Sequence, residues 1–176
     1  VVHHALLLLR LPDGNEISFP TLISGYVPGQ MDPNVHEGHA IRVPAGAKFV
    51  LQMHYTPCGT AASDLTKVGL VFMDKQKVTH EVVSLFGINP NFEIPKGVSN
   101  HVVTGVVRSF PRKGVLLAVA PHMHVRGKSF TFQLRRGDQV QSVLEVPRYD
   151  FGWQHRYELA DPIPLQEVTG MQFSAV

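Results

Sequence analysis

The chain has 176 residues, of which 44% are hydrophobic and 17% are charged, a balance typical of a globular protein and not of a disordered one. The formal net charge is +2 and the basic residues are dispersed, so nucleic-acid binding gets little support. No apolar run approaches the ~20 residues that a membrane-spanning helix needs, and we expect no membrane span.

Ten histidines are the unusual feature of the composition, and the single cysteine, Cys58, excludes an internal disulfide. We interpret Cys58 as a buried small apolar residue, with an extra soft metal ligand as the alternative. The chain begins at Val1 without an initiator Met or a signal peptide, and it stops inside a strand-like segment, residues 172–176. We therefore expect a fragment of a longer protein.

The first elements along the chain are predicted from apolar runs and turn residues. Residues 1–10 form a predicted strand with residues 6–9 buried, whereas residues 20–38 are rich in Pro and Gly and should be mostly loop. His36 and His39 end this loop; we interpret them as loop histidines and leave a metal contact open. Residues 48–55 form a predicted strand that places His54 on the face opposite to the core. The predicted core face of that strand carries Phe49, Leu51, Met53 and Tyr55.

Further strands are predicted at residues 68–73, 79–86, 101–108, 115–124, 129–135, 139–146, 153–159 and 168–175. In the strand over 129–135, Phe130, Phe132 and Leu134 should point inward, and residues 136–138 form a hairpin turn. No segment shows sustained helical periodicity. Short strands divided by Gly/Pro turns indicate an all-β sandwich or jelly roll. We expect two stacked jelly-roll-like β-sandwich domains, residues 1–76 and a truncated 77–176.

Five histidines lie on predicted strands or at strand ends: His3, His4, His54, His122 and His124. The first three form an N-terminal set and the last two a C-terminal pair, in which His122 and His124 share one strand face. Three imidazoles suit copper, zinc, nickel or non-haem iron, and a His pair completed by a Met thioether would select copper. Adjacent histidines on a regular strand face opposite ways, so a shared ion requires a twist or bulge at His3–His4.

These motifs, in this order, resemble one known family. They are similar to motifs of the copper type II, ascorbate-dependent monooxygenases. The matching stretches are His3-His4-Ala5-Leu6-Leu7, Leu51-Gln52-Met53-His54-Tyr55, and His122-Met123-His124 followed by Gly127-Lys128. This is the family of peptidylglycine α-hydroxylating monooxygenase and dopamine β-hydroxylase. The tracts at residues 92–97 and 147–154 resemble its bacterial relatives, some of which carry cytochrome c modules.

The resemblance implies two jelly-roll-like domains that face a solvent cleft. It implies an electron-relay copper on His3, His4 and His54 in the N-terminal domain, and a catalytic copper on His122 and His124 in the C-terminal one. The implied reaction is hydroxylation of a C–H bond in a small organic substrate, with O2 and a reductant such as ascorbate or a cytochrome c-like donor. The implied location is periplasmic or secreted.

The chain departs from the family at the Met ligand, whose strand would come after Val176, so the second copper site is expected to be incomplete here. Met171 is the candidate replacement, whereas Met123 is expected in the core. Two other functions stay open: a non-catalytic copper-binding or electron-transfer module of a larger periplasmic redox protein, and a plain β-sandwich interaction domain. The remaining histidines and the aromatic residues of the 147–154 tract are expected to make ordinary hydrogen bonds and packing contacts; they are His80, His101, His155, Tyr149, Phe151 and Trp153.

Overall fold

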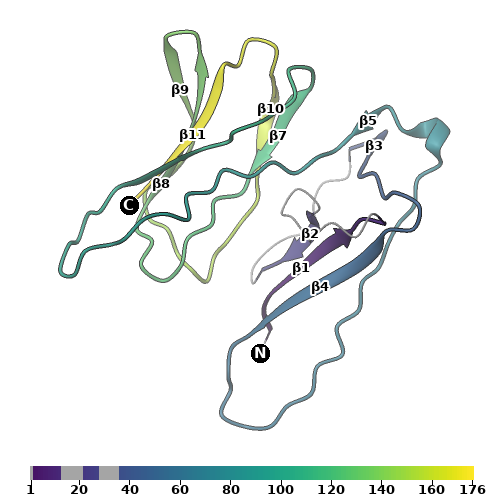
Figure 1. Ribbon diagram of the computed structural model, residues 1–176, viewed down its shortest axis with the longest axis horizontal. Helices are drawn as coiled ribbons and strands as arrows, with labels where there is room; N and C mark the ends of the chain where they lie inside the picture. The colour runs from purple at the N-terminus through teal and green to yellow at the C-terminus, as the bar shows by residue number, and fades with distance from the viewer. Residues whose placement is uncertain (1, 13–21, 28–35) are drawn as a thin grey trace. The chain divides into compact units, whose positions relative to one another are not determined.

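The computed structural model describes residues 2–12, 22–27 and 36–176, and their regular secondary structure is almost entirely β-strand (Figure 1). The predicted all-β fold class is confirmed. The chain divides into two compact units, the first ending at Ser84 and the second beginning at Leu85, whereas we expected a division at residues 76–77. Residues 77–84 belong to the first unit because β5 (His80–Glu81) pairs in parallel with β3 (His39–Ala40).

The first unit is built on a three-stranded antiparallel sheet in the order β2-β1-β4. Its strands are β1 (Val2–Arg10), β2 (Leu22–Tyr26) and β4 (Lys48–Tyr55). Strand β1 lies in the centre, and Leu7, Leu8 and Leu9 on it are all buried. The pairing of β1 with β2 shifts register between Leu7 and Leu8, where Ile23 is the extra residue on β2.

Strand β4 has the predicted bounds, but its predicted core face is wrong. Phe49, Leu51 and Tyr55 are exposed, Tyr55 at 56%. Strand β4 is at the edge of its sheet, and among the described residues β1 is the one strand that it contacts extensively. Alternation predicted correctly which side chains share a face, but it could not show whether a second layer covers that face.

Two other expectations for the first unit are also wrong. Residues 68–73 form no strand and expose Val71 and Phe72, and of residues 79–86 only the short β5 is a strand; a 3-10 turn, Lys75–Lys77, lies between these segments. An apolar run that finds no partner stays irregular, because an isolated strand leaves its backbone groups unpaired. In contrast, a strand that was not predicted, β2, forms within the segment expected to be loop. It forms because β1 provides a pairing partner, and Gly25 lies opposite Leu6.

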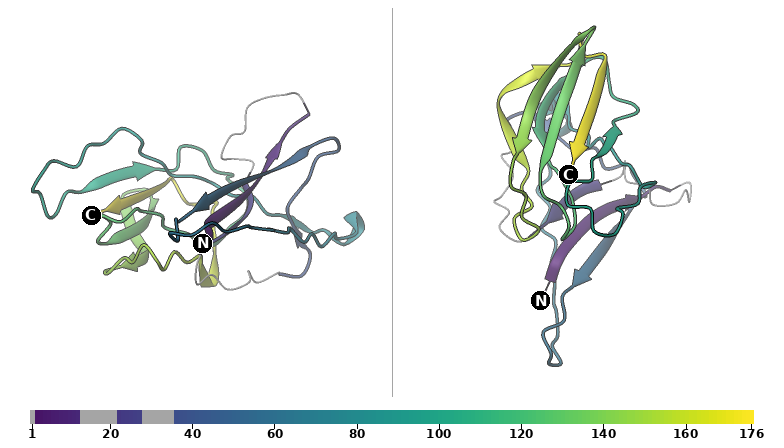
Figure 2. Two further views of the ribbon diagram at one scale, coloured as in Figure 1. Left: turned by 90° about the horizontal axis from the view of Figure 1, so that it is seen from below. Right: turned by 90° about the vertical axis from the view of Figure 1, so that its left-hand side faces the viewer.

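The second unit is a sandwich of two antiparallel sheets. A four-stranded sheet has the order β6-β11-β8-β9, and a two-stranded sheet pairs β10 with β7 (Figure 2). The buried core joins Val119 on β7 to Phe130, Phe132 and Leu134 on β8. The bounds of the strands are β6 (Val103–Val106), β7 (Val115–Val119), β8 (Phe130–Arg136), β9 (Gln139–Val146), β10 (Tyr157–Pro164) and β11 (Gly170–Ala175).

The inward alternation predicted for β8 is confirmed, because Phe130, Phe132 and Leu134 are buried and the residues between them are not. Full burial of a side chain such as Leu134 stabilises the fold by about 1.5–3 kcal/mol. The predicted hairpin turn is also present, and its Gly137 has φ +55°, a left-handed conformation that glycine adopts without strain. Among the described residues, no helix is long and apolar enough to cross a bilayer.

Candidate metal centres

The histidines of the N-terminal set lie side by side at one end of the three-stranded sheet. The ring centroids of His3 and His4 are 5.3 Å apart, and those of His4 and His54 are 3.9 Å apart with the rings tilted by 37°. His4 and His54 are direct cross-strand neighbours on β1 and β4, where side chains of opposed residues meet. Nε2 of His3 and Nδ1 of His4 are shielded from solvent. The structure therefore brings all three predicted residues together.

A β-bulge explains how two adjacent histidines reach the same place. Val2 pairs with Tyr55 and His4 with His54, so the register shifts by one and His3 is the extra residue on β1. A bulge places two residues of one strand opposite one residue of its partner and turns their side chains toward each other. This is the distortion that a shared ion requires at this position.

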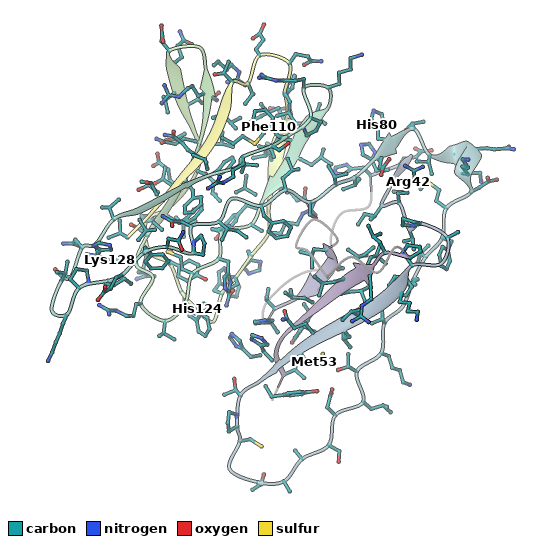
Figure 3. All side chains as sticks on the ribbon, in the orientation of Figure 1. Arg42, Met53, His80, Phe110, His124 and Lys128 are labelled. Carbon is teal, nitrogen blue, oxygen red and sulfur yellow. The ribbon has the colours of Figure 1, made fainter. Side chains whose placement is uncertain are left out.

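The C-terminal pair is also close, but not on a strand as predicted. Strand β7 ends at Val119, and His122 and His124 lie in the segment that follows it. Figure 3 labels His124. Their ring centroids are 5.1 Å apart and the rings are nearly perpendicular. Pro121 has no N–H to donate to a ladder, which favours the end of the strand here.

The side chain of Tyr149 forms hydrogen bonds with the backbone of this segment, as a neighbouring strand would. Its hydroxyl accepts a hydrogen bond from the backbone N–H of Met123 (3.0 Å) and donates one to the carbonyl of the same residue (2.7 Å). The residue between the two histidines is thus held at its backbone N–H and its carbonyl by one buried side chain. Burial raises the pKa of Tyr149 above its ordinary value of 10.0. The hydroxyl therefore keeps its proton, and with it both hydrogen bonds, throughout the neutral range.

Gly127 allows this segment to pack closely against Tyr149, whose hydrogen bonds to Met123 we call the tyrosine clamp. A Cβ on Gly127 would lie 2.7 Å from the Cβ of Met123 and 3.0 Å from Cδ1 of Tyr149. The N–H of Gly127 also closes a turn onto the carbonyl of His124 (2.9 Å). The glycine in the His-x-His…Gly-Lys motif is therefore explained by close approach of the backbone.

Gln154 orients the ring of His122. It is buried, and its Nε2 donates to the carbonyl of Phe151 (2.8 Å), which turns its Oε1 toward Nδ1 of His122 at 2.5 Å. Since an amide oxygen only accepts, Nδ1 carries the proton, and Nε2 keeps its lone pair. A ligating histidine is typically held in this way, with one ring nitrogen donating to a polar neighbour. The ring of Phe151, 6.0 Å from that of His124, packs beside the pair.

The two methionines of residues 85–176 pack in or against the core of the second unit. Met171 is 3% exposed in the core of the second unit, where it pairs with Leu134, and Met123 packs against the same core, as expected for it. Cys58 is exposed in the loop after β4, so its interpretation as a buried apolar residue is wrong. Its thiol contacts Thr60 rather than a histidine.

Residues important to the two clusters were missed from the sequence. Tyr149 and Gln154 lie in the 147–154 tract that carried part of the resemblance, but nothing in the pattern told their roles apart from packing. A third histidine cluster was missed as well. His36 and His39 are near neighbours in the chain, whereas His80 lies far from both in sequence. The ring centroids are 5.3 Å apart for His36–His39 and 4.6 Å apart for His39–His80.

The donor chemistry of the first two clusters fits copper. Three imidazoles, and two imidazoles with positions left for other ligands, are both sets that copper accepts. Within the described ranges, no group of three or more His, Cys, Asp or Glu side chains already converges as a finished metal site. Ligation at His3, His4 and His54 therefore requires their rings to turn about χ2, which is a broad torsion in histidine.

Comparison with known proteins does not assign the chain to a family. No protein-family model matches the sequence, and no curated protein matches it.

Proposed function

We propose that this chain acts as a copper-dependent monooxygenase that hydroxylates a C–H bond of a small organic substrate, using O2 and an external one-electron reductant. The observation that supports this proposal is that each of the two units has its own histidine cluster. In both clusters the backbone, and not chance proximity, sets the ring positions: a bulge at His3, and a clamped peptide between His122 and His124.

His3, His4 and His54 would hold the electron-relay copper, and His122 and His124 would hold the catalytic copper. Copper, when bound, supplies reversible one-electron redox chemistry and an open coordination position. Gln154 keeps the proton of His122 on Nδ1, and Tyr149 fixes the spacing of the two rings through the Met123 peptide. The exposed His124 gives a substrate access to the pair from solvent.

A non-catalytic copper-binding or electron-transfer module is the second candidate. It is favoured by the position of the two methionines of residues 85–176, Met123 and Met171, which pack in or against the core. Without a thioether the His122/His124 pair would bind copper weakly, while the three-His cluster would still exchange electrons. An interaction domain without metal is the third possibility that the same experiment separates.

The test combines copper stoichiometry with oxygen uptake. Copper bound per chain is measured by elemental analysis after dialysis, for the unaltered chain and for His54→Ala, His124→Ala and the control His101→Ala. We expect His54→Ala and His124→Ala each to lose one copper ion and His101→Ala to lose none. Ascorbate-dependent O2 uptake that both variants abolish supports the monooxygenase.

Two other outcomes would favour the alternative functions. Redox cycling of copper without O2 uptake, abolished by His54→Ala, would favour the electron-transfer module. Copper binding that neither substitution reduces would refute both copper functions and leave the interaction domain.

A further inference from the structure

The third histidine cluster lies wholly within the first unit, where two short strands bring distant parts of the chain together. His39 on β3 and His80 on β5 are direct partners in a parallel pair, and their rings stack with centroids 4.6 Å apart and planes 8° apart. His36 precedes β3, and its ring lies 5.3 Å from that of His39 at an angle of 54°. Figure 3 labels His80 at this edge of the unit.

The carbonyl of Gly38 ties the two segments together. It accepts hydrogen bonds from the N–H groups of Thr79 (2.8 Å) and His80 (3.0 Å) and from the Thr79 hydroxyl (3.2 Å). Gly38 has φ +73°, and a Cβ there would lie 2.3 Å from Oγ1 of Thr79. The backbone therefore holds the loop with His36 and His39 close to His80, and only glycine fits at the junction.

The hydrogen bonds also fix which ring nitrogens carry protons. Nδ1 of His39 faces the carbonyl of Glu37 at 2.9 Å, and a carbonyl only accepts, so Nδ1 of His39 is the donor. The single hydroxyl proton of Thr79 goes to Gly38, so Oγ1 of Thr79 accepts from Nδ1 of His80 at 2.9 Å. In both rings Nε2 is left with its lone pair, the tautomer that binds a metal ion.

The ring of His36 adds a second feature to this cluster. Its Nε2 is buried and has no hydrogen-bond partner within the part of the chain that the structure describes. A buried polar atom without a partner is unfavourable, and a bound cation at the cluster would satisfy it.

From this juxtaposition we propose that His36, His39 and His80 form a further metal site, which takes a divalent transition metal ion such as Zn²⁺ or Cu²⁺ through three imidazole nitrogens. Three neutral imidazoles are a donor set that these ions prefer. The stacked rings do not aim their nitrogens at one point, so binding requires small adjustments of χ1 and χ2 that keep both Nδ1 hydrogen bonds. The site is independent of the proposed monooxygenase function, because it shares no residue with either of the other clusters.

The test uses Zn²⁺ as the probe and the full chain with His54→Asn and His124→Asn, which disables the other clusters. We expect this background to bind one equivalent of Zn²⁺, measured by competition with a chromogenic chelator. Adding His39→Asn or His80→Asn should abolish that equivalent, and adding the control His101→Asn should leave it. Thr79→Val, which removes the acceptor of His80 Nδ1–H, should weaken Zn²⁺ binding about 10- to 100-fold.

No bound Zn²⁺ in the background, or Zn²⁺ that persists after His39→Asn and His80→Asn, would overturn the proposal. Thermal melting without metal shows whether each variant is folded. If a variant is not folded, the site is tested instead by ¹⁵N NMR spectra of the imidazole rings in the folded background. The Nε2 resonances of His39 and His80 should shift on addition of Zn²⁺, and unchanged resonances would refute the site. Loss of ascorbate-dependent O2 uptake on His54→Ala reports on the other clusters, so the two proposals can fail separately.

Discussion

Removal of one hydroxyl group, in Tyr149→Phe, tests how the His122/His124 pair is held. The substitution keeps the buried ring and deletes both hydrogen bonds to Met123. Each hydrogen bond of this kind contributes about 0.5–1.5 kcal/mol net, so the second unit should lose about 1–3 kcal/mol of unfolding free energy. The lower end applies if water reaches the freed peptide, since Met123 is only partly buried.

Urea unfolding followed by tryptophan fluorescence measures this loss. The sequence has one tryptophan, Trp153, which lies in the second unit and whose backbone N–H donates a hydrogen bond to the carbonyl of Asp150. Tyr157→Phe is the matched control, because the Tyr157 hydroxyl makes no hydrogen bond to any described residue. Copper affinity of the His122/His124 pair should fall about 10- to 100-fold in Tyr149→Phe, as for other groups that orient ligands.

An unfolding free energy of Tyr149→Phe within ~0.5 kcal/mol of the control would refute the reasoning, because surface-like changes stay within that range. It would mean that water forms hydrogen bonds with the Met123 backbone as favourable as those of the Tyr149 hydroxyl. Unchanged copper affinity together with reduced stability would show that the clamp is structural and does not position the pair.

Four further outcomes follow from the same unit. Gly127→Ala should cost about 1–3 kcal/mol, measured by urea unfolding, because the added Cβ overlaps close-packed neighbours. Leu134→Ala, at a fully buried position, should cost about 2–5 kcal/mol; a smaller loss would mean that the core collapses around the gap. Gln154→Leu should weaken Cu⁺ binding at His122 about 10- to 100-fold by chelator competition, with little change at the three-His cluster. The raised pKa of Tyr149 contributes stability that is complete below pH 10.0 and is lost as the pH rises through the folded-state pKa; alkaline urea titrations should show this loss in the unaltered chain and not in Tyr149→Phe.

Local patterns predicted the elements whose neighbours are also local. Strand β8 alternates as expected, and its hairpin to β9 is closed by Gly137, because pleat period and turn chemistry are properties of a few adjacent residues. The face of β4 that carries Phe49 was mispredicted because burial depends on a second layer. Residues 68–73 have a strand-like composition, but a strand also needs a partner, which no local pattern encodes.

In the candidate sites too, features set by adjacent residues could be predicted, and features that depend on distant segments could not. Proximity of His122 and His124 could be predicted from their spacing, although a tyrosine clamp and not a strand holds them. The need for a bulge at His3–His4 could be stated from strand geometry, and the structure has one. In contrast, the meeting of His39 with His80 depends on a parallel pairing between segments 41 residues apart, which nothing near either residue indicates.

The exposed thiol of Cys58 has a practical consequence for work with this chain. Hydrogen bonding with Thr60 lowers the pKa of Cys58, so a larger share of it is thiolate at neutral pH than in a free cysteine. Cupric ion oxidises accessible thiolates, and two chains can then cross-link through the resulting disulfide while part of the added metal is reduced. A Cys58→Ser background keeps titrations with Cu²⁺ free of this side reaction, and the unaltered thiol offers one defined attachment point for a spin label or a fluorophore.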